Sequence, residues 1–301
     1  MKKILTLLGC LWVGAVLLAA PVKPAAQPTE KPLLIRTQDE WNIAAFYRPA
    51  AEPEQKTVLL LHDIGKDHTA FAAFAEKIAE KGMGYLALDF RGHGGSTKYG
   101  SAQEPVLYNS FAKEGVDNDY NKMTRDVDAA MEYLKSQEIF PEEIIWVGAG
   151  LGANVAAKAS NLWPQVSGIA LLTPVTNFRD VLPIPALRVY KGKIFIAAAA
   201  DDKKTFLEAS VMRNVAFLNN GEGNVTFATA YDKKSHELLD SWVTPELLQW
   251  LQTPQRPPLL PDVLEIETQD EQDEAEEAQE LYFPAHTSGA PRGPLVPSVL
   301  Q

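Results

Sequence analysis

The chain has one cysteine among its 301 residues, Cys10, and no cluster of basic residues. Because this single thiol lies in the N-terminal segment, the rest of the chain can form no disulfide and has no thiol nucleophile. Binding to nucleic acid requires Lys or Arg gathered on one face, where they contact phosphates. We therefore expect no nucleic-acid partner.

The net charge of −11 is concentrated near the C-terminus. Asp262–Glu280 contains ten acidic residues and no basic one, so the remaining chain is nearly neutral. Residues 254–301 are rich in acidic residues, Gln, Pro and Gly, a composition that cannot form a packed core. We predict a disordered tail. The alternative is a tail that binds an unidentified protein partner, in which Leu281, Tyr282 and Phe283 would make the apolar contact.

The N-terminus combines Lys2 and Lys3 with an uncharged, mostly apolar run, Ile4–Ala20. This pattern is typical of an export signal, so residues 1–20 predict a periplasmic or otherwise extracytoplasmic location. Pro21 follows the small residues at which cleavage is expected, and seventeen residues are near the minimum for crossing a bilayer. Cleavage, retention as the only membrane anchor, and lipidation at the lipobox-like Cys10 therefore stay open.

A proline-rich spacer at residues 21–32 precedes segments that alternate between strand and helix character. Thr57–His62 is a continuous apolar run, as expected of a strand buried on both faces. Phe71–Lys81 and Met123–Lys135 carry apolar residues at helical spacing. We predict strands at Leu33–Thr37, Asn42–Tyr47, Thr57–His62, Tyr85–Phe90, Ile144–Val147, Gly168–Leu172, Lys193–Ala199 and Asn224–Ala230, with helices between them at Phe71–Lys81, Met123–Lys135, Ala153–Ser160 and Phe206–Phe217, and a last one at Pro245–Leu251. Residues 33–253 thus predict one α/β domain, a mostly parallel eight-stranded sheet with helices on both faces.

The strand that begins at Ile144 runs into Gly148-Ala149-Gly150-Leu151-Gly152 and then into a helix. Strand, tight turn and helix are the setting of the G-x-S-x-G nucleophile elbow. The central residue of that motif sits in a strained turn, and side chains two positions away would collide with the backbone. Here both flanking glycines are present, whereas the central residue is Gly150.

Further candidate residues follow the other predicted strands. His62 ends the third strand and begins a loop, Asp63 and Ile64, that would supply one oxyanion donor, with Leu151 supplying the other. Asp201 follows the predicted strand Lys193–Ala199, and His236 follows the last strand. Together with the turn Asp89–Ser96, this order resembles the α/β-hydrolase superfamily. The segment between Thr173 and Lys193 is too short for a lid domain, so the chain is most similar to compact dienelactone hydrolases.

The resemblance implies a small carboxylic ester or lactone as the ligand, a triad acid at Asp201 or the adjacent Asp202, and a triad histidine at His236. Gly150 has no atom that could attack a carbonyl, so we expect a protein without serine-hydrolase activity that binds a ligand or partner. The alternative is a weak hydrolase in which His236 activates water. Asp63 would repel negative charge at an oxyanion site, so we expect it to point away and cap the next helix.

Two further readings of the motifs are weaker. Gly148, Gly150 and Ala153 match part of a dinucleotide fingerprint, but the next strand ends at Leu172 without the acidic residue that would bind a ribose. Turns of this kind are usually structural, so Ser96 is a substitute nucleophile only if its turn is an exception. We therefore predict no cofactor and no metal.

Overall fold

The computed structural model describes residues 29–253. The predicted export signal, most of the spacer and the acidic tail lie outside these residues. None of the helices that the structure describes is long and apolar enough to cross a membrane.

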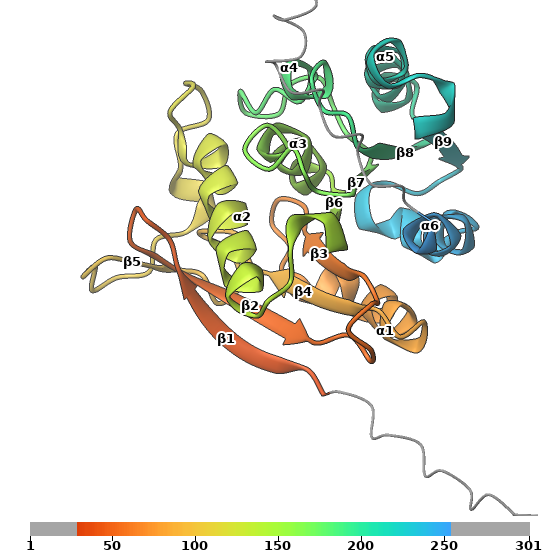
Figure 1. Ribbon diagram of the computed structural model, residues 1–301. Coiled ribbons are helices and arrows are strands. Elements are labelled where there is room, and N and C mark those ends of the chain that lie inside the picture. Colours follow the sequence, from red (N-terminus) through yellow and green to blue (C-terminus); the bar gives the residue numbers. More distant parts are fainter. Residues whose placement is uncertain (1–28, 254–301) are drawn as a thin grey trace, which may run out of the picture.

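The described chain forms a nine-stranded sheet flanked by helices, which confirms the predicted fold class (Figure 1). The strands are β1 (Lys31–Arg36), β2 (Trp41–Arg48), β3 (Thr57–Leu61), β4 (Gly84–Leu88), β5 (Lys98–Tyr99), β6 (Ile144–Ala149), β7 (Gly168–Leu172), β8 (Lys193–Ala199) and β9 (Val225–Ala230). The α-helices are α1 (Ala72–Glu80), α2 (Asp119–Ser136), α3 (Leu151–Ala159), α4 (Ile184–Leu187), α5 (Lys203–Asn220) and α6 (Val243–Gln252).

The strand order is β1-β2-β4-β3-β6-β7-β8-β9, with β2 antiparallel to its neighbours and the strands from β4 to β9 parallel. The prediction of eight strands missed β5, which pairs with β2 at Trp41 and Tyr99. Two residues are too few to show the alternating pattern by which a strand is recognised. Between β7 and β8 the only α-helix is the four-residue α4, so this span holds no lid domain.

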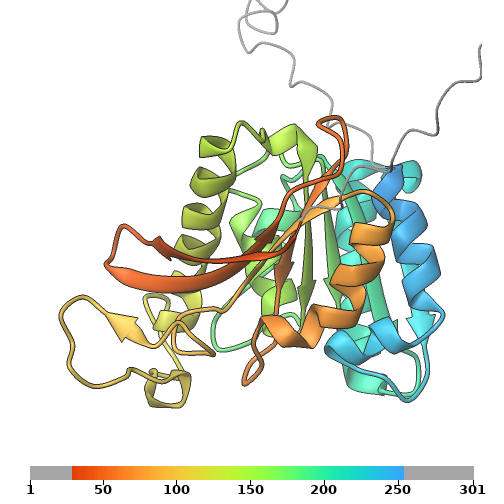
Figure 2. The ribbon, with the colours of Figure 1, turned by 90° about the horizontal axis from the view of Figure 1, so that it is seen from below.

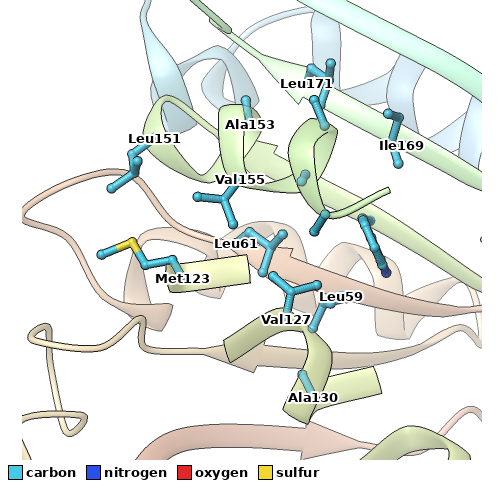
Figure 3. Close-up of a cluster of buried hydrophobic side chains, with 14 of the residues drawn as sticks. Leu59, Leu61, Met123, Val127, Ala130, Leu151, Ala153, Val155, Ile169 and Leu171 are labelled. Atoms are coloured by element: carbon cyan, nitrogen blue, oxygen red, sulfur yellow. The ribbon is translucent and has the colours of Figure 1, made fainter. Parts of the chain in front are cut away.

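Helices cover both faces of the sheet, and Figure 2 shows α1 and α6 on one side of the strands and α2 on the other. The central strands β3, β4, β6 and β7 are buried along their whole length, because each is packed on both faces. On the α2 and α3 side, Leu59 and Leu61 lie in one cluster with Val127 and Leu151 (Figure 3). Each such side chain contributes about 1.5 to 3 kcal/mol by leaving water. This packing fixes the loops at the carboxyl ends of the strands, where the candidate site lies.

Candidate functional site

The turn between β6 and α3 consists of Gly150, with φ 53° and ψ −116°. Its N–H donates to the carbonyl of Leu172 at 2.9 Å, which ties the turn to the end of β7. A residue with a side chain is strained at this positive φ. Close packing also explains the flanking glycines, since a Cβ on Gly148 would collide with the backbone of Gly152, and one on Gly152 with the carbonyl of Leu61.

The carboxylate of Asp63 occupies the space above Gly150. Its Oδ1 accepts hydrogen bonds from the backbone N–H groups of Leu151 at 2.8 Å and Ile64 at 2.7 Å. These are the two donors that the sequence predicted for an oxyanion, and the structure brings them together on one oxygen. A Cβ built on Gly150 would overlap both carboxylate oxygens of Asp63.

The expectation that Asp63 points away to cap the next helix is wrong. The following 3₁₀ turn, His68–Phe71, is capped by Asp67, whose side chain accepts from the N–H of Thr69. Asp63 turns inward because Gly150 leaves room for it and two N–H groups stabilise its charge. A carboxylate in this position repels any negative charge that would develop on a substrate.

His62 holds the loop that carries Asp63. It is fully buried, its Nδ1 donates to the carbonyl of Asp63 at 2.7 Å, and its Nε2 accepts from the N–H of Phe90 at 2.9 Å. Burial, reinforced by the nearby His93, lowers the pKa of His62 to about 4, so the ring is neutral at pH 7. The loop after β3 is thereby attached to the end of β4. His62 positions Asp63 and leaves no ring nitrogen for chemistry.

The predicted acid and histidine are not paired. His236 lies in the 3₁₀ turn Ser235–Asp240 after β9, and its Nδ1 is buried without a hydrogen-bond partner among residues 29–253. Asp201 is exposed and accepts from the N–H of Asp232 at 3.0 Å, which lowers its pKa. Within residues 29–253, no hydrogen bond or ion pair joins the imidazole of His236 to Asp201 or Asp202, so no acid orients His236 there.

Asp202, the alternative acid, has a structural role. Its side chain accepts from the N–H of Thr205 and so caps α5. It also pairs with the Nζ of Lys234 at 2.7 Å, and this hydrogen bond lowers the pKa of Asp202. These two contacts engage the carboxylate of Asp202 without His236.

Backbone strain gathers beside His236, which the sequence did not reveal. Thr173, Asp232 and Ser235 have φ values of 53°, 55° and 55°, and the N–H of Ser235 donates to Thr173 Oγ1 at 2.8 Å. The hydroxyl of Ser235 is buried and, in the described chain, has no hydrogen-bond partner. Strained backbone and unsatisfied polar atoms are typical of functional sites. Thr and Ser do not favour positive φ, so no residue pattern could have predicted this strain.

The turn after β4 is structural. Ser96 is fully buried, donates from Oγ to the carbonyl of Asp89 at 2.6 Å and accepts from the N–H of Ala44 at 2.8 Å, so it is not an available nucleophile. Asp67, His68 and Asp89 bring polar atoms within 4.8 Å of one another. Asp89 already accepts from both the N–H and the ring of His68, each at 2.8 Å, and Asp67 accepts from Thr69, so each of the three residues has a partner within the protein.

Comparisons with known proteins agree with the fold. Residues 52–238 match the family described as serine aminopeptidase, S33, over more than half of the chain. No curated protein matches the chain in sequence.

Similar solved structures include an esterase of Pyrococcus furiosus (17% identity, 74% of this chain and 92% of the esterase covered, TM-score 0.59). A dienelactone hydrolase of Anabaena variabilis has 12% identity, with 75% and 97% covered and a TM-score of 0.59. An esterase of Exiguobacterium antarcticum has 13% identity, with 73% and 99% covered and a TM-score of 0.54. At these identities the likeness shows the shared fold. By its sequence match and its sheet, the chain belongs to the S33 serine aminopeptidase family of the α/β-hydrolase superfamily.

Proposed function

We propose that this chain is a member of the α/β hydrolases without serine-hydrolase activity, in which Gly150 stands at the position of the nucleophilic serine. The observation that carries the proposal is the carboxylate of Asp63, which accepts from both N–H groups that would stabilise an oxyanion. The unpaired Nδ1 of His236 supports the same conclusion, because a triad histidine needs an acid to fix its tautomer.

The occupied oxyanion site favours binding of a partner over binding of a small ester or lactone. A ligand carbonyl would have to displace Asp63 from two charge-assisted hydrogen bonds, each worth about 1.5 to 3 kcal/mol. The displaced carboxylate would remain half-buried beside the ligand. Protein binding through another surface requires no such displacement.

Labelling by a fluorophosphonate tests the proposal, because the reagent requires an activated hydroxyl. We expect no labelling and no turnover of a p-nitrophenyl ester by the wild type. Gly150→Ser alone also stays unlabelled, since its side chain would overlap Asp63. Gly150→Ser with Asp63→Gly removes the obstacle, and labelling that then disappears on adding His236→Ala assigns both positions. Wild-type turnover that His236→Ala abolishes would instead show an active hydrolase.

We also propose that Lys2, Lys3 and the apolar run 4–20 export the chain. Cell fractionation of the full-length chain tests this, with Lys2→Glu/Lys3→Glu and a deletion of 4–20 as variants. Recovery of the wild type mainly from the cytoplasm would contradict export. Export and lack of catalysis are measured separately, so either proposal can fail alone.

A further inference from the structure

Helix α5 carries an exposed stripe of four residues, Leu207, Val211, Asn214 and Leu218, called the α5 stripe below. The residues are spaced by four, three and four positions, which places them on one face of a helix. All four are exposed, and the side chains of Leu207 and Leu218 are 65% and 88% accessible. The stripe is thus a seam of the kind by which two helices pack.

The opposite face of α5 already packs on the sheet. Ala209, Met212 and Ala216 are buried there, against β8 and β9. In Figure 1, α5 lies at the margin of the sheet beside β9, with α4 as its neighbouring helix. Helix α5 therefore has apolar residues on two opposite faces and uses only one of them within the described chain. Exposed apolar surface of this kind marks an interaction site on a soluble domain.

The charges on α5 indicate which surface would cover the stripe. Lys203 and Lys204 begin the helix, whereas no charged residue follows Arg213 before its end at Asn220. A helix placed antiparallel to α5 would put its own uncharged C-terminal end, which carries the negative end of the helix dipole, beside these lysines. A second copy of α5 meets this requirement at both ends. A parallel copy would bring four lysines together.

We propose that two copies of this chain associate through the α5 stripe, antiparallel and related by a twofold axis. Because the spacing of the stripe is the same in both directions, Leu207 of one copy meets Leu218 of the other, and Val211 meets Asn214. The polar Asn214 and the short seam make this a weak dimer that dissociates on dilution. Oligomeric state is measured without any ester, so this proposal and the one on catalysis fail independently.

Sedimentation of the full-length chain over a range of concentrations tests the dimer. In the dimer, Leu218→Glu places one negative charge from each copy in the seam. We therefore expect the dissociation constant of the dimer to rise at least about 10-fold. Because Leu218 is 88% exposed, the variant should fold normally, which circular dichroism checks. Leu162→Glu is the matched control, as Leu162 is also exposed, at 57%, but lies after α3. A monomeric wild type, or a dimer lost with Leu162→Glu and kept with Leu218→Glu, would overturn the proposal.

Cysteine pairs test the orientation, in a chain whose single native thiol is removed by Cys10→Ser. Mixing Val211→Cys with Asn214→Cys should give a disulfide between the two variants faster than either gives one with itself. Faster self-coupling of Asn214→Cys would show a parallel pair and contradict the antiparallel arrangement. If the wild type is a monomer and dimerises only when Tyr282→Ser and Phe283→Ser are introduced, the α5 stripe is covered by the tail of the same chain.

Discussion

Two basic side chains of the described residues differ in their partners, since Arg91 pairs with two carboxylates and His236 with none. Arg91 is fully buried, donates to Asp126 at 2.7 and 2.9 Å, and reaches Asp39 at 2.8 and 3.1 Å. His236 makes no hydrogen bond or ion pair with Asp201 or Asp202, the two acids that the sequence predicted for it.

The difference reflects what each group does for folding. An unpaired guanidinium in the core would cost several kcal/mol, so Arg91 requires both acids. Burial would raise the pKa of Asp39, but hydrogen bonds from Arg91 outweigh burial and hold it well below its usual range. A buried imidazole nitrogen without a partner costs less than a buried guanidinium without one, because a guanidinium is always charged. Arg91 thus keeps two acidic partners, whereas Asp201 and Asp202 make contacts that do not involve His236.

Removing Arg91 gives the largest expected effect. Arg91→Met leaves Asp126 buried without its partner, so we expect the free energy of unfolding to fall by about 3 to 5 kcal/mol. Urea denaturation measures this loss. Lys234→Met, which removes the exposed partner of Asp202, is the control and should change the free energy of unfolding far less. Equal losses in the two variants would remove the distinction between the groups.

Acid should weaken the fold through His62. Its pKa is lowered to about 4 in the folded chain, whereas the unfolded chain takes up the proton near the ordinary value of 6.5. Stability is therefore lost as the pH falls from 6.5 to 4, by about 3 kcal/mol for this group. Comparing denaturation at several pH values, we expect His62→Gln to flatten the dependence of stability on pH. An unaltered slope in His62→Gln would place the titration elsewhere.

A side chain at position 150 would overlap the carboxylate of Asp63, which predicts a smaller loss of stability that depends on residue 63. Gly150→Ser should cost about 2 kcal/mol, from positive φ and from displacement of Asp63. In an Asp63→Gly background the cost should drop by about 1 kcal/mol, which a double-mutant cycle measures. Gly221→Ser is the control, since Gly221 has φ 73° and open space around its Cβ position. Its cost should not depend on residue 63.

The smallest effect is expected at His236. Because its Nδ1 makes no hydrogen bond, His236→Ala should change the free energy of unfolding by no more than about 0.5 kcal/mol. His62→Ala, which removes two hydrogen bonds, provides the contrast in the same denaturation series. A large loss at His236 would show that it has an acidic partner after all and that the catalytic group is assembled.

Sequence patterns predicted the scaffold better than the site. The limits of β7 and β8 agree with prediction, because short apolar runs mark strands buried on both faces. The direction of Asp63 could not be predicted, since it depends on the empty space at Gly150, which is distant in sequence and adjacent only after folding. Asp201 followed the expected strand, but its contact with Asp232 depends on a strained loop that no residue pattern marks.

The overlap of Asp63 with the space above Gly150 also bears on how this chain can change over time. A serine codon arising at position 150 gains nothing while Asp63 remains, because the new side chain collides with the carboxylate. A glycine arising first at position 63 removes the two hydrogen bonds that Asp63 accepts and supplies no hydroxyl at position 150. The two positions are therefore sterically coupled. Under the proposed function, a serine at position 150 becomes useful only together with a smaller residue at position 63.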